Sequence, residues 1–231
     1  MNPNAAYIIP QAPILNTKRI TKFENFSIDD SILLKSTLYL SLLENFTKKE
    51  SKIDFYFFLD EADKEFLPEE FKQKNINFYF TDITNKNSMF ENLSSKEFSD
   101  HKNNIIITSD LVGINISELE RLINLLNIED ESLLISKSKG DDIGIFGFNN
   151  YSSEVFYNLV KSGFKYDDFL SRIKSSSHFI HAASEVLLIK SIDDFKLLYT
   201  ALSQKKSIEY CSQEMHERFT HLFIEYKDLL K

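Results

Sequence analysis

The sequence predicts an α/β fold in which a mostly parallel sheet is covered by helices on both faces. The apolar, β-branched run at 105–107 is typical of a strand that is buried on both faces. Other apolar runs alternate along the chain with stretches of helical spacing, which favours parallel strands joined by helices. The central run ends on Ser109 and Asp110, so a carboxylate stands at the carboxyl end of a buried strand. Open α/β sheets bind their ligands at that edge, which makes Asp110 a candidate site residue.

Before the central run, short strands are expected at 7–9, 53–59 and 76–80. A helix is expected from about Asp29, because acidic residues are favourable at the positive end of a helix and an apolar stripe continues to Phe46. The irregular loop at 11–20 carries Lys18 and Arg19. A loop after the first strand lies at the ligand edge, so these cations are candidates for binding phosphate. A solvated pair of surface charges is the equally weighted alternative.

After the central run, the sequence predicts a helix from about Ser117 and strands at 132–136 and 143–148. An acidic turn with Asp141 and Asp142 joins the two strands and should lie at the same sheet edge as Asp110. Carboxylates that converge there would suit Mg²⁺ or Mn²⁺, which prefer oxygen ligands and bridge substrate phosphates. The favoured interpretation of Asp141 and Asp142 is an ordinary turn, because Gly and Asp dominate turns for backbone reasons.

In the last third of the chain, the sequence pattern predicts helices near 155–160 and 169–173, a strand at 186–189 and a helix that starts at Ser191. From 208 to 229, apolar residues recur at spacings of three and four, which predicts one amphipathic helix of roughly six turns. We therefore expect a domain at 1–203 and a C-terminal helix within 204–231 that packs on it. The alternative is a helix offered to a protein partner or to a second copy of the chain. Cys211 is interpreted as a small buried residue of this helix.

Composition excludes several classes of protein. The net charge of −8 over 231 residues argues against general nucleic-acid binding, which needs a surplus of Lys and Arg. One cysteine excludes an intramolecular disulfide, and five glycines leave no room for a Gly-rich phosphate loop. No signal-like segment and no apolar run near the ~18 residues of a membrane span is found. A cytoplasmic protein that does not span a membrane is therefore expected.

The order of these motifs resembles a family of small bacterial proteins of the GT-A nucleotide-diphospho-sugar transferase type, often described as glycosyltransferases. Residues 9–13, with Lys18 and Arg19, resemble the first strand and Ala-Pro loop of the family, which implies that Pro13 and the two cations face the nucleotide. Residues 108–110 resemble the Ser-Asp that closes its central strand. The resemblance implies a three-layer GT-A-like α/β sandwich, with Asp110 at the nucleotide-sugar and metal site and the C-terminal helix as an addition.

Residues 188–195 resemble the segment that leads into the last helix of the family, but with a change of charge. The family has Asp-x-Asp-Thr-Pro there, whereas this chain has Leu188 and Lys190 at the acidic positions. A lysine repels a divalent ion. Mg²⁺ or Mn²⁺ at Asp110 is thus one expectation, and a metal-independent variant, in which Lys190 supplies the positive charge, is the other. The glycines of the first loop and of the acidic turn are also reduced.

The leading hypothesis is transfer of a glycosyl group from a nucleotide-activated sugar to an unknown acceptor. In it, Asp110 contacts the ribose or a metal, Lys18 and Arg19 hold the phosphates, and Asp141 or Asp142 acts as acceptor base or polar anchor. One alternative is a non-catalytic binding module that keeps the fold. Another is nucleotidyl transfer onto a sugar phosphate, which usually needs a Gly-rich first loop. An open cleft reaching Asp110, Lys18 and Arg19 would favour the enzyme, and a cleft filled by Phe side chains would favour the module.

Overall fold

The computed structural model describes residues 2–48, 50–72, 76–94 and 97–231. Seven of the strands in these ranges form one sheet of order β3-β2-β1-β4-β7-β6-β8. They are β1 (Asn4–Ile9), β2 (Ile53–Asp60), β3 (Phe78–Thr81), β4 (Asn103–Thr108), β6 (Ser132–Lys137), β7 (Ile143–Phe148) and β8 (Phe179–Ala182). The first four in this order pair in parallel, β7 is antiparallel to both β4 and β6, and β8 is parallel to β6. The expected mostly parallel sheet is confirmed.

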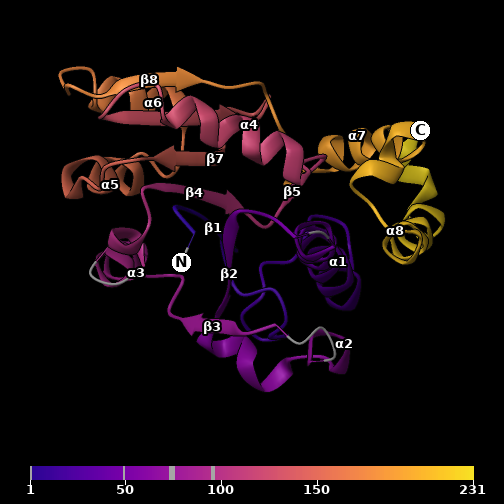
Figure 1. Cartoon of the computed structure of the whole chain (residues 1–231). Helices are drawn as coiled ribbons and strands as arrows, with labels where there is room; N and C mark the ends of the chain where they lie inside the picture. Colours follow the sequence, from indigo (N-terminus) through magenta and orange to yellow (C-terminus); the bar gives the residue numbers. More distant parts are fainter. Residues whose placement is uncertain (1, 49, 73–75, 95–96) are drawn as a thin grey trace.

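Helices cover both faces of the sheet, as Figure 1 shows. One face packs against α1 (Ile28–Thr47), α4 (Ile116–Leu126), α7 (Ile192–Leu202) and α8 (Gln213–Glu225), and the other against α3 (Lys86–Ser94), α5 (Ser153–Lys161) and α6 (Tyr166–Arg172). Strand residues alternate between the two cores: Ile8 and Ile107 face the first group, and Tyr7 and Ile106 face the second. The predicted three-layer sandwich is therefore confirmed. None of the described helices combines the length and hydropathy that crossing a bilayer requires.

Side-chain caps explain where the helices of the first core begin. Ser27 accepts a hydrogen bond from the backbone N–H of Asp30 at the start of α1. Ser191 and Asp194 form a reciprocal capping box at the start of α7, which agrees with the helix expected there. Short elements complete the chain: α2 (Glu69–Lys72), β5 (Leu111–Val112), β9 (Leu187–Leu188) and the 3-10 turns η1 (Glu61–Phe66), η2 (Phe98–Asp100), η3 (Lys205–Glu209) and η4 (Lys227–Leu230).

The strand expected at 186–189 forms, but in a separate two-stranded sheet. β9 pairs antiparallel with β5, and the backbone N–H of Ile189 donates to the carbonyl of Asp110 at 2.9 Å. Gly144 permits this approach, because a Cβ atom there would lie 2.8 Å from side-chain carbons of Leu188 and Val186. The pairing carries the chain after β9 back beside the end of β4. The edge strand β8 was not expected, since its four residues are all partly or fully exposed and lack an apolar run.

The prediction of one long C-terminal helix is wrong. The segment is divided into η3, α8 and η4, and Ile208, expected on the apolar stripe, is 81% exposed. Ser212 starts a new helix by accepting from the backbone N–H of Met215, so the helical hydrogen bonds do not run through the buried Cys211 before it. α8 packs on the body of the protein: the Tyr226 ring beyond its end stacks on Phe26, with ring centroids 3.8 Å apart.

Candidate functional site

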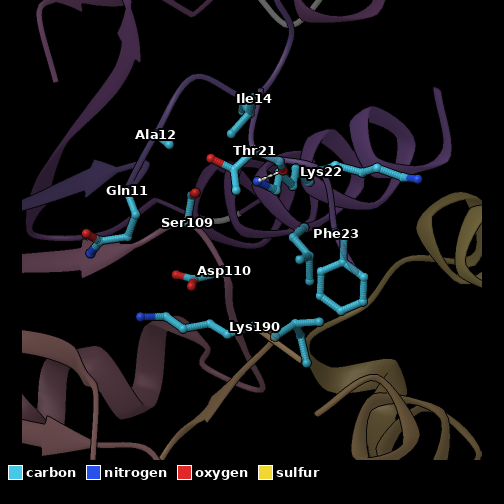
Figure 2. Close-up of a pocket in the computed structure, with 12 residues that line it drawn as sticks. Gln11, Ala12, Ile14, Thr21, Lys22, Phe23, Ser109, Asp110 and Lys190 are labelled. Carbon is cyan, nitrogen blue, oxygen red and sulfur yellow. Dashed lines mark hydrogen bonds between the residues drawn. The ribbon is translucent and has the colours of Figure 1, made fainter. Parts of the chain in front are cut away.

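A pocket of about 270 Å³ opens at the carboxyl edge of β1 and β4. Its lining comes from the loop after β1, from α1, from the end of β4 and from the segment after β9: Gln11, Ala12, Ile14, Thr21, Lys22, Phe23, Lys35, Leu38, Ser109, Asp110, Ile189 and Lys190. Figure 2 shows Ser109, Asp110 and Lys190 close to one another on one side and the Phe23 ring on another. The pocket thus joins an acidic and cationic side to an apolar side, a combination typical of small-molecule sites.

Asp110 is the acidic centre of this pocket. Its Oδ1 atom is buried and has no hydrogen-bond partner among the described residues. Burial raises the pKa of Asp110 above its usual value, and the positive charge of Lys190 opposes that rise. A buried polar atom without a partner is unfavourable by roughly 1–3 kcal/mol, which a ligand that donates a hydrogen bond would remove.

The acidic turn and the end of β4 lie at the same edge of the sheet, as expected. β7 is antiparallel to β4, so its first residues lie beside the last residues of β4. The Asp142 carboxylate is held between two lysines: the Lys190 Nζ lies 3.0 Å and the Lys165 Nζ 3.1 Å from Asp142 Oδ1. Asp142 therefore neutralises and positions Lys190, and its charge is already paired on two sides.

Asp141 has a different place from its neighbour. Its backbone φ of 67° lies in the left-handed region, and its carbonyl accepts from the backbone N–H of Tyr166 at 2.8 Å. The Asp141 carboxylate accepts from the N–H of Asp167 at 3.3 Å, in the first turn of α6. These contacts give Asp141 a structural role in the turn, and its side chain is not part of the pocket lining.

Solved structures share this architecture. A proposed nucleotide-diphospho-sugar transferase from Desulfovibrio desulfuricans G20 aligns over 100% of this chain and 97% of its own, with a TM-score of 0.75 and 15% sequence identity. The chain has the nucleotide-diphospho-sugar transferase fold. No family model and no curated protein matches the sequence.

Two further solved structures align with lower TM-scores. A cytidylyltransferase from Leptospira borgpetersenii aligns over 100% of this chain and 97% of its own, with a TM-score of 0.52 and 13% identity. A 4-diphosphocytidyl-2C-methyl-D-erythritol synthase from Anaerococcus prevotii aligns over 87% and 99%, with a TM-score of 0.51 and 13% identity. A proposed nucleotide-diphospho-sugar transferase and a cytidylyltransferase therefore share this fold with the chain.

Within this transferase fold, three residues that the resemblance placed at the nucleotide lie outside the pocket. Pro13 is buried, and only its neighbours in the loop contribute to the lining. Lys18 is exposed, and the half-exposed Arg19 places Nη1 3.7 Å from Asp60 Oδ1. The loop turns away because its backbone is tied to the buried Asp63. The cleft reaches Asp110 without reaching Lys18 or Arg19, so it satisfies only part of the expectation for an enzyme.

Two lysines that sequence reasoning missed lie at this edge instead. Lys35 lines the pocket from α1, and its Nζ donates to the carbonyl of Thr21 at 2.7 Å. Lys86, at the start of α3, donates to the carbonyl of Ile83 at 2.8 Å, and burial lowers its pKa to about 8. Burial also lowers the pKa of Lys35, while the charge of Asp110 opposes the shift of both lysines. Lysines on helices resemble solvated surface charges in a sequence, which gave no signal for either residue.

Asp110 has charged neighbours of both signs, Lys190 and Asp142. Across the described ranges, no three His, Cys, Asp or Glu side chains are grouped to hold a metal ion. Lys190 lines the pocket together with Asp110, and its charge acts on that carboxyl group. Hard cations need several oxygen ligands, and an ammonium group beside them is repulsive.

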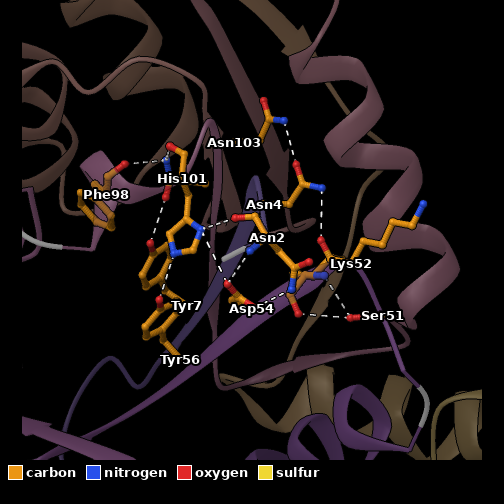
Figure 3. A network of polar contacts seen from close by, with 12 residues as sticks. Asn2, Asn4, Tyr7, Ser51, Lys52, Asp54, Tyr56, Phe98, His101 and Asn103 are labelled. Atoms are coloured by element: carbon orange, nitrogen blue, oxygen red, sulfur yellow. Dashed lines mark hydrogen bonds and ion pairs between the residues drawn. The ribbon is translucent and has the colours of Figure 1, made fainter.

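The opposite edge of the sheet carries a second polar cluster, shown in Figure 3. The Tyr7 hydroxyl donates to Asn104 Oδ1 at 2.9 Å, and the Tyr56 hydroxyl lies 2.9 Å from His101 Nε2. His101 Nδ1 lies 4.0 Å from Asp54 Oδ2. These groups join β1, β2 and the start of β4 to the segment before β4, and they use one another as partners. We interpret this amino-edge network as structural.

Proposed function

We propose that the pocket at the carboxyl edge binds a nucleotide-activated sugar, and that the protein transfers the glycosyl group to an acceptor. The observation that carries the proposal is the buried, partnerless Oδ1 of Asp110 in a pocket lined by Lys35 and Lys190. A carboxylate suits the hydroxyls of a ribose or sugar, and lysines suit the phosphates. The likeness to a proposed nucleotide-diphospho-sugar transferase supports the same choice of ligand.

In this proposal each side chain has a role set by its contacts. Asp110 accepts a hydrogen bond from a hydroxyl of the donor. Lys35 and Lys190 hold the phosphates and stabilise the negative charge that develops there as the bond from the sugar to phosphate breaks. Asp142 is the polar anchor that positions Lys190, because its carboxylate already contacts two lysines. The acceptor oxygen forms the new bond to the sugar carbon, the nucleotide leaves with the electron pair of the broken bond, and the proton of the acceptor passes to water.

We further propose that the lysines supply the positive charge that Mg²⁺ or Mn²⁺ would bring. The absence of a group of metal-ligating side chains among the described residues supports this, as does Lys190 beside the carboxylates. Charge supplied by side chains predicts that adding Mn²⁺ leaves the affinity for the nucleotide-sugar unchanged.

A second candidate function is a binding module that holds the nucleotide-sugar without turnover. One observation favours it: among the described lining residues, Asp110 is the only acidic one, and Asp142 nearby is engaged by two lysines. No lining carboxylate besides Asp110 is then left to take the proton of an acceptor. Binding with no released nucleotide over long incubation would favour this module over the transferase.

The test is a thermal-shift screen of UDP-, GDP-, CMP- and dTDP-linked sugars, with and without Mn²⁺. A ligand at ~100 times its dissociation constant should stabilise the wild type by about 2.7 kcal/mol. The shift should vanish in Asp110→Ala and persist in Asp54→Ala, which changes a carboxylate at the opposite edge of the sheet. A screen in which no nucleotide-sugar shifts the wild type would reject the proposed function.

A further inference from the structure

The loop after β1 makes an unusual set of contacts. Three consecutive backbone N–H groups, those of Ile14, Leu15 and Asn16, donate to the Asp63 carboxylate at 2.9, 2.9 and 2.8 Å. Asp63 is fully buried. Successive N–H groups that converge on one point form a nest, a concavity that binds anions and that phosphate loops use for phosphate. In this chain an internal carboxylate fills the nest.

The loop is fixed in this position by further contacts with the same segment. Asn16 Nδ2 donates to the carbonyl of Ala62 at 2.9 Å, and Asp60 Oδ1 accepts from the N–H of Ala62 at 2.9 Å. Arg19 reaches towards Asp60 rather than into the pocket. The loop and the start of η1 therefore hold each other in place. The donors of the loop cannot turn to a ligand without breaking these bonds.

The nest lies at the edge of the sheet where the pocket opens. It belongs to the loop at the carboxyl end of β1, the edge at which open α/β sheets bind ligands. Ile14, one of the donors, also lines the pocket. The nest therefore borders the pocket, and its donors point at Asp63.

We propose that Asp63 occupies the place of a phosphate in the first loop as a permanent internal anion, and that it makes the pocket select a nucleotide-activated sugar over a nucleoside triphosphate. The inference rests on the proposed function and deepens it. A triphosphate needs more donors than a diphosphate, and the three N–H groups best placed to supply them are engaged. The Asp63 carboxylate also repels a further phosphate near the loop. Glycosyl transfer is then favoured over nucleotidyl transfer.

The first arm of the test uses the wild type alone. Inorganic tripolyphosphate, CTP and UTP are compared with the nucleotide-sugar that gives the largest thermal shift. The triphosphates should bind at least roughly tenfold more weakly than the nucleotide-sugar, since they lack loop donors. A triphosphate that binds the wild type as tightly as the nucleotide-sugar would overturn the proposal.

The second arm removes the Asp63 carboxylate from the nest. Asp63→Ala and Asp63→Ser should lower the melting temperature, and inorganic phosphate or tripolyphosphate should restore several degrees in both variants while shifting the wild type by less than about one degree. Asp54→Ala, which removes a carboxylate at the other edge of the sheet, should show no phosphate-dependent recovery. If both Asp63 variants unfold, refolding in phosphate is the readout, and a failure of phosphate to restore either variant contradicts the proposal.

The two proposals fail in different ways. Recovery of the Asp63 variants by phosphate, without any nucleotide-sugar binding to the wild type, would reject the proposed function and keep Asp63 as the internal anion. Nucleotide-sugar binding without phosphate recovery would reject the role of Asp63 and keep the proposed function.

Discussion

The polar network at the amino edge of the central sheet and the pocket at its carboxyl edge differ in how their buried polar groups are paired. At the amino edge, Tyr7, Asn104, Tyr56 and His101 bond to one another or to nearby backbone carbonyls, and the buried Asn103 Oδ1 is the unpartnered exception among the described atoms there. At the carboxyl edge, Asp110 keeps an unpartnered Oδ1 inside a pocket. A satisfied network stabilises the fold, whereas the unpartnered Oδ1 of Asp110 gains a hydrogen bond only when a ligand donates one.

Burial shifts pKa values at both edges: at the amino edge it raises the pKa values of the Tyr7 and Tyr56 hydroxyls, which are neutral at pH 7 and have hydrogen-bond partners. At the carboxyl edge burial raises the pKa of Asp110 and lowers those of Lys35 and Lys86, so burial disfavours the charged form of each group. Charges that burial disfavours in the free protein are typical of binding sites, because the ligand supplies the missing partners. The comparison predicts that changes in the amino-edge network cost stability, and that changes at Asp110 and Lys190 in the pocket cost binding.

The largest effect on stability is expected for Asn104→Ala. Asn104 is buried, accepts from Tyr7 and donates to the carbonyls of Phe98 and His101. Removing its amide group therefore leaves these buried groups without a hydrogen-bond partner. Urea unfolding should show a loss of roughly 2–4 kcal/mol, with binding of the nucleotide-sugar unchanged in the folded protein. A loss below about 1 kcal/mol would show that the network contributes little.

Comparison with Lys86→Met should show how burial of the Lys86 charge makes the free energy of unfolding depend on pH. The folded pKa of Lys86 is about 8, below the ordinary value of 10.5, so between these values the unfolded chain holds a proton that the folded protein has lost. Wild-type stability should therefore rise with pH across this window relative to the variant, by up to about 3 kcal/mol. Urea titrations from pH 7 to 10.5 measure the difference, with the exposed Lys102→Met as control. A pH-independent difference would contradict the burial of this charge.

Lys190→Met and Lys165→Met form a matched pair with a smaller effect. Both lysines contact Asp142 Oδ1, but only Lys190 lines the pocket. Each partly exposed ion pair contributes at most about 1 kcal/mol, so the two variants should lose similar, small stability. Titration with the nucleotide-sugar should show a loss of roughly tenfold in affinity for Lys190→Met alone. Equal losses in both variants would remove Lys190 from the site.

Asp110→Asn should have the smallest effect on stability. Because the pKa of Asp110 is raised in the folded protein, wild-type stability falls as pH rises above the ordinary value of 3.8 through the folded one. The variant lacks this fall, so at pH 7 it should be at least as stable as the wild type. Unfolding curves at pH 3, 5 and 7 test this; a variant that loses stability as pH rises, relative to wild type, would show that Asp110 is a structural carboxylate.

The sheet could be predicted from the sequence because buried strands are continuous apolar runs, as at 105–107 in β4. The edge strand β8 was missed because it has no such run. The prediction of one long C-terminal helix was wrong for a local reason. The apolar spacing continues past Cys211, but the Ser212 cap starts a new helix there. The spacing of apolar residues does not show that a capping residue ends one helix and begins another.

The site was predictable only where strand ends position it. Asp110 and Asp142 could be placed at one edge because the helix between β4 and β6 lets both strands run in the same direction, so the turns after them lie at the same edge. Lys18 and Arg19 could not be placed, because the direction of their loop depends on hydrogen bonds to Asp63, which lies 47 to 49 positions away from the donors in sequence. Such long-range polar contacts leave no periodic signal.

The central claim is that the carboxyl edge binds a nucleotide-activated sugar through Asp110. Calorimetric titration of the nucleotide-sugar with the largest thermal shift tests it on the wild type, Asp110→Asn and Tyr7→Phe. We expect saturable binding to the wild type and to Tyr7→Phe, and a loss of at least roughly tenfold in affinity for Asp110→Asn. Undiminished affinity in Asp110→Asn, or a loss in Tyr7→Phe alone, would contradict the claim.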